Sequence, residues 1–198
     1  EQLRFARFEF NQALDLRPHR VEPAVHLITV AMGLQSGDVD EHFERALAID
    51  PYDPEAYDQA LWAHRGHWGR NPTATLAIAR RALASEDYHT GVPDWGRYAI
   101  EKIIQDYGLE AAQPYVANIW PELSAYLDRR AEQPTPLSDT AYFFQLGVKL
   151  AHAAGRPDDR DAYLRRLRDV GGRILNPEAY GLTAQGIPTA APARATES

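Results

Sequence analysis

The sequence predicts an all-α protein in which antiparallel helical hairpins stack as an α-solenoid of about eight or nine helices. A repeat is the first observation: residues 13–18 recur 33 residues later as residues 46–51, in the pattern Ala-Leu-x-(Leu or Ile)-x-Pro. The second is that apolar residues return with the 3.6-residue period of a helix. The third is that prolines and glycines fall where these periodic segments start and stop, as expected of helix boundaries.

Three helices are predicted before residue 51. Residues 1–17 carry an apolar stripe that ends at Pro18. Residues 21–35 are apolar in the same way, and Ser36-Gly37 supplies the stop. Asp38 or Asp40 is predicted to cap the next helix, which runs to Ile49.

Two helices in the middle of the chain share one start signal, a capping residue followed by proline. Asp53-Pro54 begins a helix that ends near Gly66, and Asn71-Pro72 begins another that runs through Leu83. Residues 93–107 form the helix after these, closed by Gly108. Each has apolar residues at helical spacing, so each is predicted to bury one face.

The carboxyl-terminal third is predicted to hold a less regular set of helices. Residues 109–131 contain Pro114 and Pro121, which predict two short segments or one helix kinked near Trp120. A helix starting at Thr135-Pro136 runs to Gly155, and the last runs from Asp158 or Asp159 to Gly171. Residues 1–182 are therefore interpreted as one helical repeat domain, and residues 183–198, rich in Ala, Pro and Thr, as a flexible tail.

The repeat has the side-chain pattern of a known family. Ala6-x-x-x-Phe10, followed by Ala13 and Pro18, resembles the second helix of a tetratricopeptide repeat. Phe43, Ala46 and Pro51 repeat that spacing, with Val39 where the family has a small residue. In this register residues 1–17 are a second helix without its first, as expected if the chain is part of a longer protein or if something else takes the place of the missing helix.

A second resemblance covers approximately residues 40–110. The run Ala-Ile-Asp-Pro-Tyr-Asp-Pro-Glu-Ala-Tyr at 48–57, with His-Trp-Gly at 67–69, is similar to an uncharacterised bacterial family of tetratricopeptide-like domains. That resemblance implies the fold and carries no catalytic residues with it.

Composition narrows the classes of partner. With 44% hydrophobic and 25% charged residues the chain can bury a core, and its net charge of -7 argues against nucleic acid as a partner. It has no cysteine, and no apolar run approaches the roughly 18 residues of a membrane span. We expect a cytoplasmic protein with a protein or peptide partner, no membrane association and an oligomeric state that the sequence leaves open.

The strongest candidate site lies where the repeat pattern gives way, in the run Trp-Ala-His-Arg-Gly-His-Trp-Gly-Arg-Asn at 62–71. Indole and guanidinium groups are the side chains most enriched where partners bind. The leading hypothesis is therefore a peptide-binding or protein-binding scaffold that uses the concave face of the repeats. The other interpretation is that Trp62 and Trp68 are core residues between hairpins. The predicted contacts are Tyr57, Trp62, His64, His67, Trp68, Arg70 and Trp95.

Two other functions stay open. A small-molecule or metal-dependent enzyme would use a pocket lined by the same Trp and His residues, with His64-x-x-His67 on one helix face and His42, Asp38 or Glu41 nearby. No His-Glu-x-x-His, Gly-rich phosphate loop or Gly-x-Ser-x-Gly occurs, so we predict no metal, no cofactor and no catalytic residue. The third function is self-association, or docking to a longer protein, through the exposed face of residues 1–17.

Overall fold

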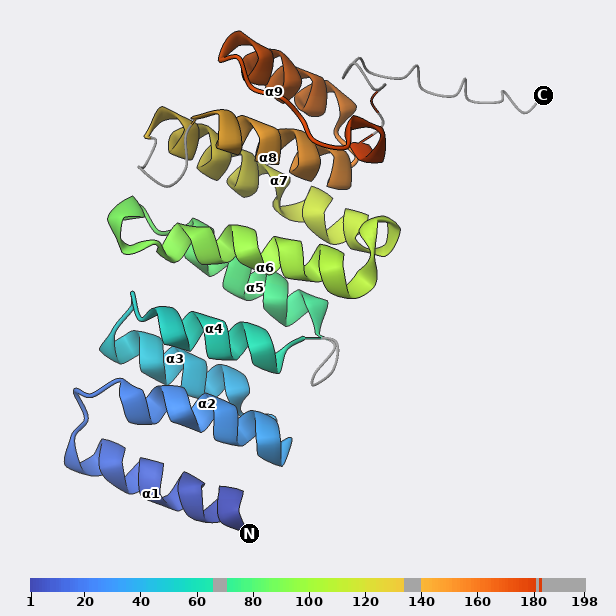
Figure 1. Cartoon of the computed structure of the whole chain (residues 1–198). Coiled ribbons are helices and arrows are strands. Elements are labelled where there is room, and N and C mark those ends of the chain that lie inside the picture. Colours follow the sequence, from blue (N-terminus) through green and yellow to red (C-terminus); the bar gives the residue numbers. More distant parts are fainter. Residues whose placement is uncertain (66–70, 134–139, 181, 183–198) are drawn as a thin grey trace. The chain divides into compact units, whose positions relative to one another are not determined.

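The computed structural model describes residues 1–65, 71–133, 140–180 and 182. Within these ranges the chain forms nine α-helices and two short 3₁₀ helices (Figure 1). The α-helices are α1 (Gln2–Leu16), α2 (Glu22–Leu34), α3 (Val39–Ile49), α4 (Pro54–Ala63), α5 (Pro72–Leu83), α6 (Val92–Tyr107), α7 (Leu109–Glu132), α8 (Thr140–Ala153) and α9 (Pro157–Asp169), and the 3₁₀ helices are η1 (Tyr88–Thr90) and η2 (Pro177–Tyr180). The described residues confirm the predicted all-α class and number of helices.

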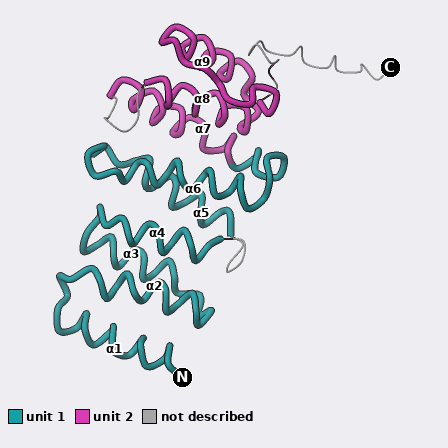
Figure 2. The backbone as a smooth tube through the Cα atoms, in the orientation of Figure 1, with its two compact units in different colours: residues 1–115 teal, residues 116–198 magenta. Residues whose placement is uncertain are grey.

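The chain divides into two compact units, residues 1–115 and residues 116–198 (Figure 2). The boundary falls inside α7. Each unit has its own set of buried apolar side chains. No linker marks this division in the sequence, because the helical periodicity continues through it, although Pro114 lies next to the boundary. The single domain over 1–182 stays a prediction.

The cap-and-proline signals mark helix starts as predicted. The Asp53 Oδ1 atom accepts a hydrogen bond from the Ala56 amide at 2.7 Å, and α4 begins at Pro54. In the same way the Asn71 Oδ1 atom accepts from the Ala74 amide at 3.0 Å, and α5 begins at Pro72. Both side chains satisfy an amide that the first turn of a helix leaves without a partner.

The third predicted cap is different. Asp38 occupies the N-cap position of α3, but its side chain makes no capping hydrogen bond. Its carboxylate is used by Arg7 of α1 and by the Ser36 hydroxyl instead. A longer-range ion pair has therefore replaced the local interaction that the sequence predicted.

Helices of unit 1 pack in a regular order along the chain. α1 packs on α2, α2 on both α3 and α4, α3 on α4, α4 on both α5 and α6, and α5 on α6. Each of these helices thus contacts the next one along the chain, and α2 and α4 also contact the second helix after them. Buried alanines lie where these helices meet, and Ala24, Ala46, Ala56, Ala60 and Ala79 are fully buried. Small side chains of this kind let helix backbones approach closely.

Gly96 shows how close that approach is between α5 and α6. A Cβ atom added at Gly96 would lie 2.5 Å from the Leu83 Cγ atom and 2.8 Å from the backbone oxygen of Ala79. Leu83 and Ala79 both belong to α5. Any residue other than glycine must therefore push the two helices apart.

Unit 2 contains the later part of α7 together with α8 and α9. Tyr163 of α9 lies in its core, where its hydroxyl donates to an Asp128 carboxylate oxygen at 2.9 Å. Burial, followed by this carboxylate, raises the pKa of Tyr163 above its ordinary value. The Arg166 guanidinium donates to the same Asp128 oxygen at 2.6 Å, so one carboxylate of α7 holds two side chains of α9.

Two prolines do not divide α7 into segments. The sequence predicted two short segments or one kinked helix, and the first alternative is wrong, because α7 runs unbroken from Leu109 to Glu132. A proline inside a helix costs about 3 kcal/mol. Four large apolar residues, each fully buried, follow one face and offset that cost at about 1.5 to 3 kcal/mol apiece. They are Val116, Ile119, Leu123 and Leu127.

Some predictions concern residues outside the described ranges. The start of the helix predicted at Thr135-Pro136 and the tail at 183–198 both lie there. Within the described residues, no helix combines the length and the apolar character needed to cross a bilayer.

Candidate functional site

Trp62 presents a large aromatic surface to solvent near the end of α4. Its side chain is 44% exposed, although tryptophan is usually buried to a greater degree. The Arg65 guanidinium carbon lies over the indole at 5.1 Å from the ring centroid, within the range of a cation–π interaction. Trp62 and Arg65 are three residues apart, so the end of α4 brings them together locally.

Asp106 of α6 fixes the position of Arg65. The Arg65 Nη2 atom donates to the Asp106 Oδ1 atom at 2.9 Å, and its Nε atom donates to Oδ2 at 3.3 Å. Both side chains are largely shielded from solvent, and the hydrogen bond to Asp106 raises the pKa of Arg65. A two-point contact of this kind sets the plane of a guanidinium. The exposed indole therefore has a fixed cation against one face.

His64 is the C-cap residue of α4, and its side chain is shielded from solvent. It is buried, and its Nε2 atom lies 2.7 Å from the Oδ1 atom of Asp40 in the first turn of α3. The two residues also line a hollow of about 380 Å³ between the ends of α2 and α4 and the starts of α3 and α5. An imidazole held by a carboxylate beside a cavity is an arrangement that can bind or move a proton.

Tyr57 belongs to the core and not to a surface. Only 2% of it is exposed, and its ring packs edge-on against Phe43 with 5.4 Å between centroids. Burial raises the pKa of Tyr57. This position removes Tyr57 from the predicted contacts, because a partner has no access to it.

Trp95 packs against a residue of its own helix. It is half-buried in the first turn of α6, where its ring packs edge-on against Tyr98 at 5.5 Å. Asp106, which holds Arg65 beside Trp62, is about 16 Å further along the same helix, at roughly 1.5 Å per residue. The other three predicted contacts, His67, Trp68 and Arg70, lie outside the described residues.

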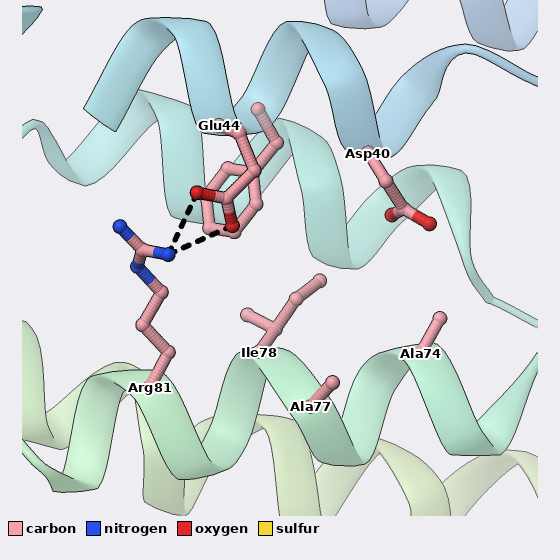
Figure 3. Close-up of a pocket in the computed structure, with 7 residues that line it drawn as sticks. Asp40, Glu44, Ala74, Ala77, Ile78 and Arg81 are labelled. Atoms are coloured by element: carbon pink, nitrogen blue, oxygen red, sulfur yellow. Dashed lines mark hydrogen bonds and ion pairs between the residues drawn. The ribbon is translucent and has the colours of Figure 1, made fainter. Parts of the chain in front are cut away.

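A second hollow, of about 260 Å³, lies between α3 and α5 (Figure 3). Arg81 and Glu44 close one end of it, with the Arg81 Nη1 atom donating to both Glu44 oxygens at 2.8 and 2.7 Å. Asp40 stands on α3 toward the other end, and Ala74 and Ile78 of α5 line the wall facing it. This hollow is small, and its lining is largely apolar between Arg81 and Glu44 at one end and Asp40 toward the other.

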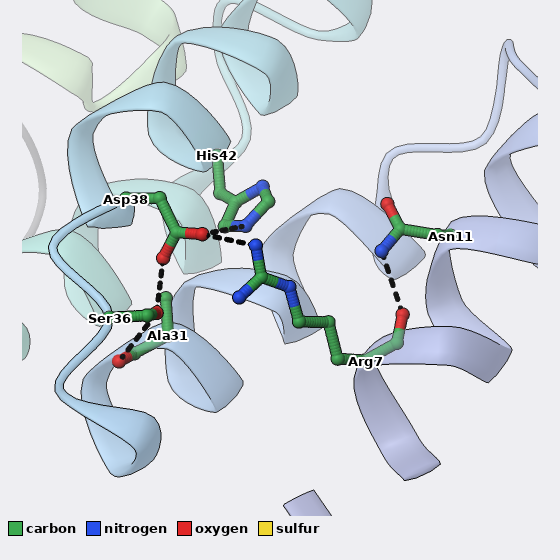
Figure 4. Close-up of polar contacts among 6 residues, drawn as sticks. All are labelled: Arg7, Asn11, Ala31, Ser36, Asp38 and His42. Atoms are coloured by element: carbon green, nitrogen blue, oxygen red, sulfur yellow. Dashed lines mark hydrogen bonds and ion pairs between the residues drawn. The ribbon is translucent and has the colours of Figure 1, made fainter. Parts of the chain in front are cut away.

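A polar cluster joins α1 to α3 (Figure 4). The Asp38 carboxylate pairs with Arg7 at 2.5 Å, accepts from the Ser36 hydroxyl, and lies 3.6 Å from the His42 Nε2 atom. His42 is buried, and neither of its ring nitrogens has a hydrogen-bond partner among the described residues. Burial lowers the pKa of His42 more than Asp38 raises it.

The histidines considered for a metal site do not converge in the described part of the chain. His42 lies beside Asp38, whereas His64 is paired with Asp40. No group of three His, Cys, Asp or Glu side chains among the described residues is placed to hold a metal ion. His67 lies outside those residues.

No family model, curated protein or solved structure matches this chain. The likeness to tetratricopeptide repeats therefore stays a prediction from the sequence pattern.

Sequence reasoning missed three residues of this site: Arg65, Asp106 and Asp40. Asp40 had a usable signal, because in an antiparallel hairpin the start of α3 lies beside the end of α4, where His64 stands. Arg65, just after α4, and Asp106, in α6, are 41 residues apart in the sequence. Only the packing of α4 on α6 brings them together.

The buried state of His42 predicts a pH dependence of stability. Because its pKa is lowered on folding, the unfolded chain binds more protons below about pH 6.5, and the free energy of unfolding should fall as the pH falls from about 7 to about 5. His42→Leu should flatten that dependence, measured by urea denaturation at a series of pH values.

Two other groups, His152 and Asp38, also affect how stability depends on pH. The pKa of His152 is also lowered by burial, so part of the slope should remain in the variant. Burial alone would raise the pKa of Asp38, but hydrogen bonds and Arg7 outweigh it and lower the pKa, so Asp38 loses its contribution only below its ordinary value of 3.8. An unchanged slope over the same pH range in His42→Leu would contradict the assignment.

Proposed function

We propose that this protein is a helical-repeat interaction module, with hairpins stacked in the manner of tetratricopeptide repeats, that binds a peptide or partner domain on the surface of α2, α4 and α6. The packing of α2 on α4 and of α4 on α6 supports the stacking. In the proposed repeat, α2, α4 and α6 are each the first helix of a hairpin. The proposed function rests on one observation: the indole of Trp62 is exposed, and Asp106 holds the Arg65 guanidinium against one face of it.

The physical argument concerns the cost of ordering side chains on binding. An immobilised side chain costs about 0.5 to 1.5 kcal/mol when a complex forms. Arg65 is already ordered by Asp106, so a partner that covers Trp62 does not bear that cost. Tryptophan and arginine are the residues that most often dominate binding energy.

Polar groups on α2, α4 and α6 extend this surface. Gln59 is one turn before Trp62 on α4, and the Thr29 hydroxyl of α2 donates to its Oε1 atom at 2.9 Å. On α6, the Lys102 ammonium lies 4.6 Å from the centre of the Tyr98 ring. Hydrogen-bonding groups around an aromatic anchor fit a polypeptide partner. The net charge of -7 disfavours a nucleic acid.

A random peptide library displayed on phage tests the proposal. Peptides selected on the wild-type protein should bind the Trp62→Ala variant at least about 30-fold more weakly by fluorescence polarisation, which corresponds to a loss of about 2 kcal/mol. Tyr52→Ala is the matched control, since Tyr52 is 45% exposed against 44% for Trp62, and it should bind as the wild type does. Selected peptides that bind Trp62→Ala equally well would overturn the proposed surface.

The paired His64 and Asp40 favour a second function, a small-molecule site in the hollow that they line. A histidine oriented by a carboxylate is the usual form of a general base. A thermal-shift screen of small metabolites and of zinc, nickel and manganese tests it, with His64→Gln as the comparison. A ligand that stabilises the wild type and not the variant would support this function, and the absence of any shift would count against it.

A further inference from the structure

One carboxylate oxygen of Asp38 lies between α1 and a buried histidine (Figure 4). The Arg7 Nη2 atom of α1 donates to the Asp38 Oδ2 atom at 2.5 Å, and the His42 Nε2 atom of α3 lies 3.6 Å from the same oxygen. The other oxygen, Oδ1, accepts from the Ser36 hydroxyl. Arg7 and His42 therefore have one acceptor between them.

A proton on His42 would have to compete for that acceptor. His42 is 5% exposed, and neither ring nitrogen has a hydrogen-bond partner among the described residues. An imidazolium carries two N–H donors, and a buried charge needs a partner. The carboxylate within reach is that of Asp38, whose Oδ2 atom already pairs with Arg7. Protonation of His42 thus sets two cations against one oxygen.

The contact between Arg7 and Asp38 is the one side-chain hydrogen bond or ion pair that joins α1 to any other described part of the chain. The apolar attachment of α1 is also small. Leu14 is its only buried residue, and the Phe10 ring packs on His26 of α2 with 5.0 Å between centroids. Loss of the contact between Arg7 and Asp38 would therefore remove the whole polar attachment of this helix.

Arg7 is the cation that leaves more easily. Its side chain is 41% exposed, against 7% for the side chain of His42. A half-exposed guanidinium regains hydration when it moves into water, whereas a buried imidazolium depends on its partner. Asp38 stays ionised in the meantime: burial would raise its pKa, but hydrogen bonds and Arg7 outweigh burial and lower it.

Burial has the largest effect on His42 and lowers its pKa, so a form in which the ring meets water binds a proton more readily than the packed form. Acid therefore favours opening as the pH falls below the ordinary value of 6.5. The charged groups that act on the ring are Asp38 and Glu41, which raise its pKa, and Arg7 and Arg45, which lower it. The titratable groups of α2 and α4, the helices packed against α3, are not among them; these are Glu22, His26, Glu55, Tyr57, Asp58 and the C-cap residue His64.

We propose that His42 is a pH-sensitive switch for α1: on binding a proton it takes the Asp38 carboxylate from Arg7, and α1 separates from α2 while the rest of unit 1 stays folded. The effect goes beyond a pH dependence of overall stability, because the opening is confined to one helix. Release bares the face of α2 that α1 covers. The surface that is open to a partner therefore changes between about pH 7 and about pH 5.

Hydrogen exchange of the whole chain, read by mass spectrometry at about pH 7 and about pH 5, tests the switch. Expressing the rates as protection factors removes the intrinsic effect of pH on exchange. The protection of residues 2–16 should fall by about 3- to 25-fold between these values, and the upper figure applies if only the released form binds the proton. At about pH 5, α1 should be less protected than α4 and α5, because it opens on its own.

Three variants separate the switch from other causes of opening. His42→Leu removes the competing imidazole, so α1 should keep its protection at about pH 5. His26→Leu is the matched control, because His26 also lies against α1 but is exposed, and the pH-dependent fall should remain. Arg7→Met should lower the protection of α1 at about pH 7 and remove most of the further fall, since no second cation then competes for Asp38. Arg7 is half-exposed, so this variant decides the question even if His42→Leu fails to fold.

Two sets of results would overturn the proposal. The first is an α1 that exchanges only together with α4 and α5, or whose protection does not change with pH. The second is a pH-dependent fall that persists in His42→Leu or in Arg7→Met, or that disappears in His26→Leu.

Discussion

Gly96→Ala should lower the free energy of unfolding by about 1 to 3 kcal/mol, the range found for overpacked helix contacts. An added Cβ atom would lie 2.8 Å from the Ala79 backbone oxygen, which cannot move without shifting α5 as a whole. Alanine is otherwise the better helix former by about 1 kcal/mol, so the expected loss has the opposite sign to intrinsic propensity. Urea denaturation measures the effect, and hydrogen exchange of α5 and α6 amides locates it.

Gly33→Ala is the matched control. Gly33 lies in α2, and a Cβ atom there would meet the terminal Cδ1 atom of Leu3 at 2.9 Å. The end of a flexible side chain can rotate away, so this variant should be neutral or stabilised by up to about 1 kcal/mol. If the two glycine substitutions have equal effects, close packing of α5 on α6 is not the reason for Gly96.

Trp120→Ala should cost about 3 to 5 kcal/mol, the largest effect expected of any single substitution proposed for this chain. Trp120 is 5% exposed, its Nε1 atom donates to the Asp159 Oδ2 atom at 2.8 Å, and its ring lies edge-on to Tyr163. Truncation removes the buried indole and leaves the Asp159 carboxylate without that donor. Thermal and urea denaturation, followed by near-ultraviolet circular dichroism, measure the loss.

Trp62→Ala makes the corresponding test at the surface. The same residue type is replaced, but the indole of Trp62 is exposed and contacts Arg65 on one face. Its expected cost in folding stability is less than about 1 kcal/mol. A loss comparable to that of Trp120→Ala would show that Trp62 is a core residue, and would remove the basis for its role as an anchor.

Much of the fold could be predicted because helix boundaries are local. Asp53-Pro54 and Asn71-Pro72 start α4 and α5 through hydrogen bonds that span only three residues. The buried stripe of α7 is different: it outweighs Pro114 and Pro121 through burial that extends over several turns. Local rules about proline could not weigh that contribution.

The candidate site was predicted only in part, and the periodicity of α4 explains the error. Tyr57 and Trp62 are five residues apart, which rotates them by about 140° around the helix. They therefore could not both face a partner, and the structure buries Tyr57 while exposing Trp62. The pairing of Arg65 with Asp106 depends on the packing of α4 on α6 and had no signal in the sequence.

The sequence by itself determined the all-α class, the helix number and most helix boundaries, because caps, prolines and helical periodicity act within a few residues. Tertiary structure alone decided which aromatic residues are buried, which carboxylate each histidine meets, and that Arg65 is fixed beside Trp62. The physical reason is that contacts such as His64 with Asp40 and Arg65 with Asp106 join residues 24 and 41 positions apart, and their geometry follows from how whole helices pack.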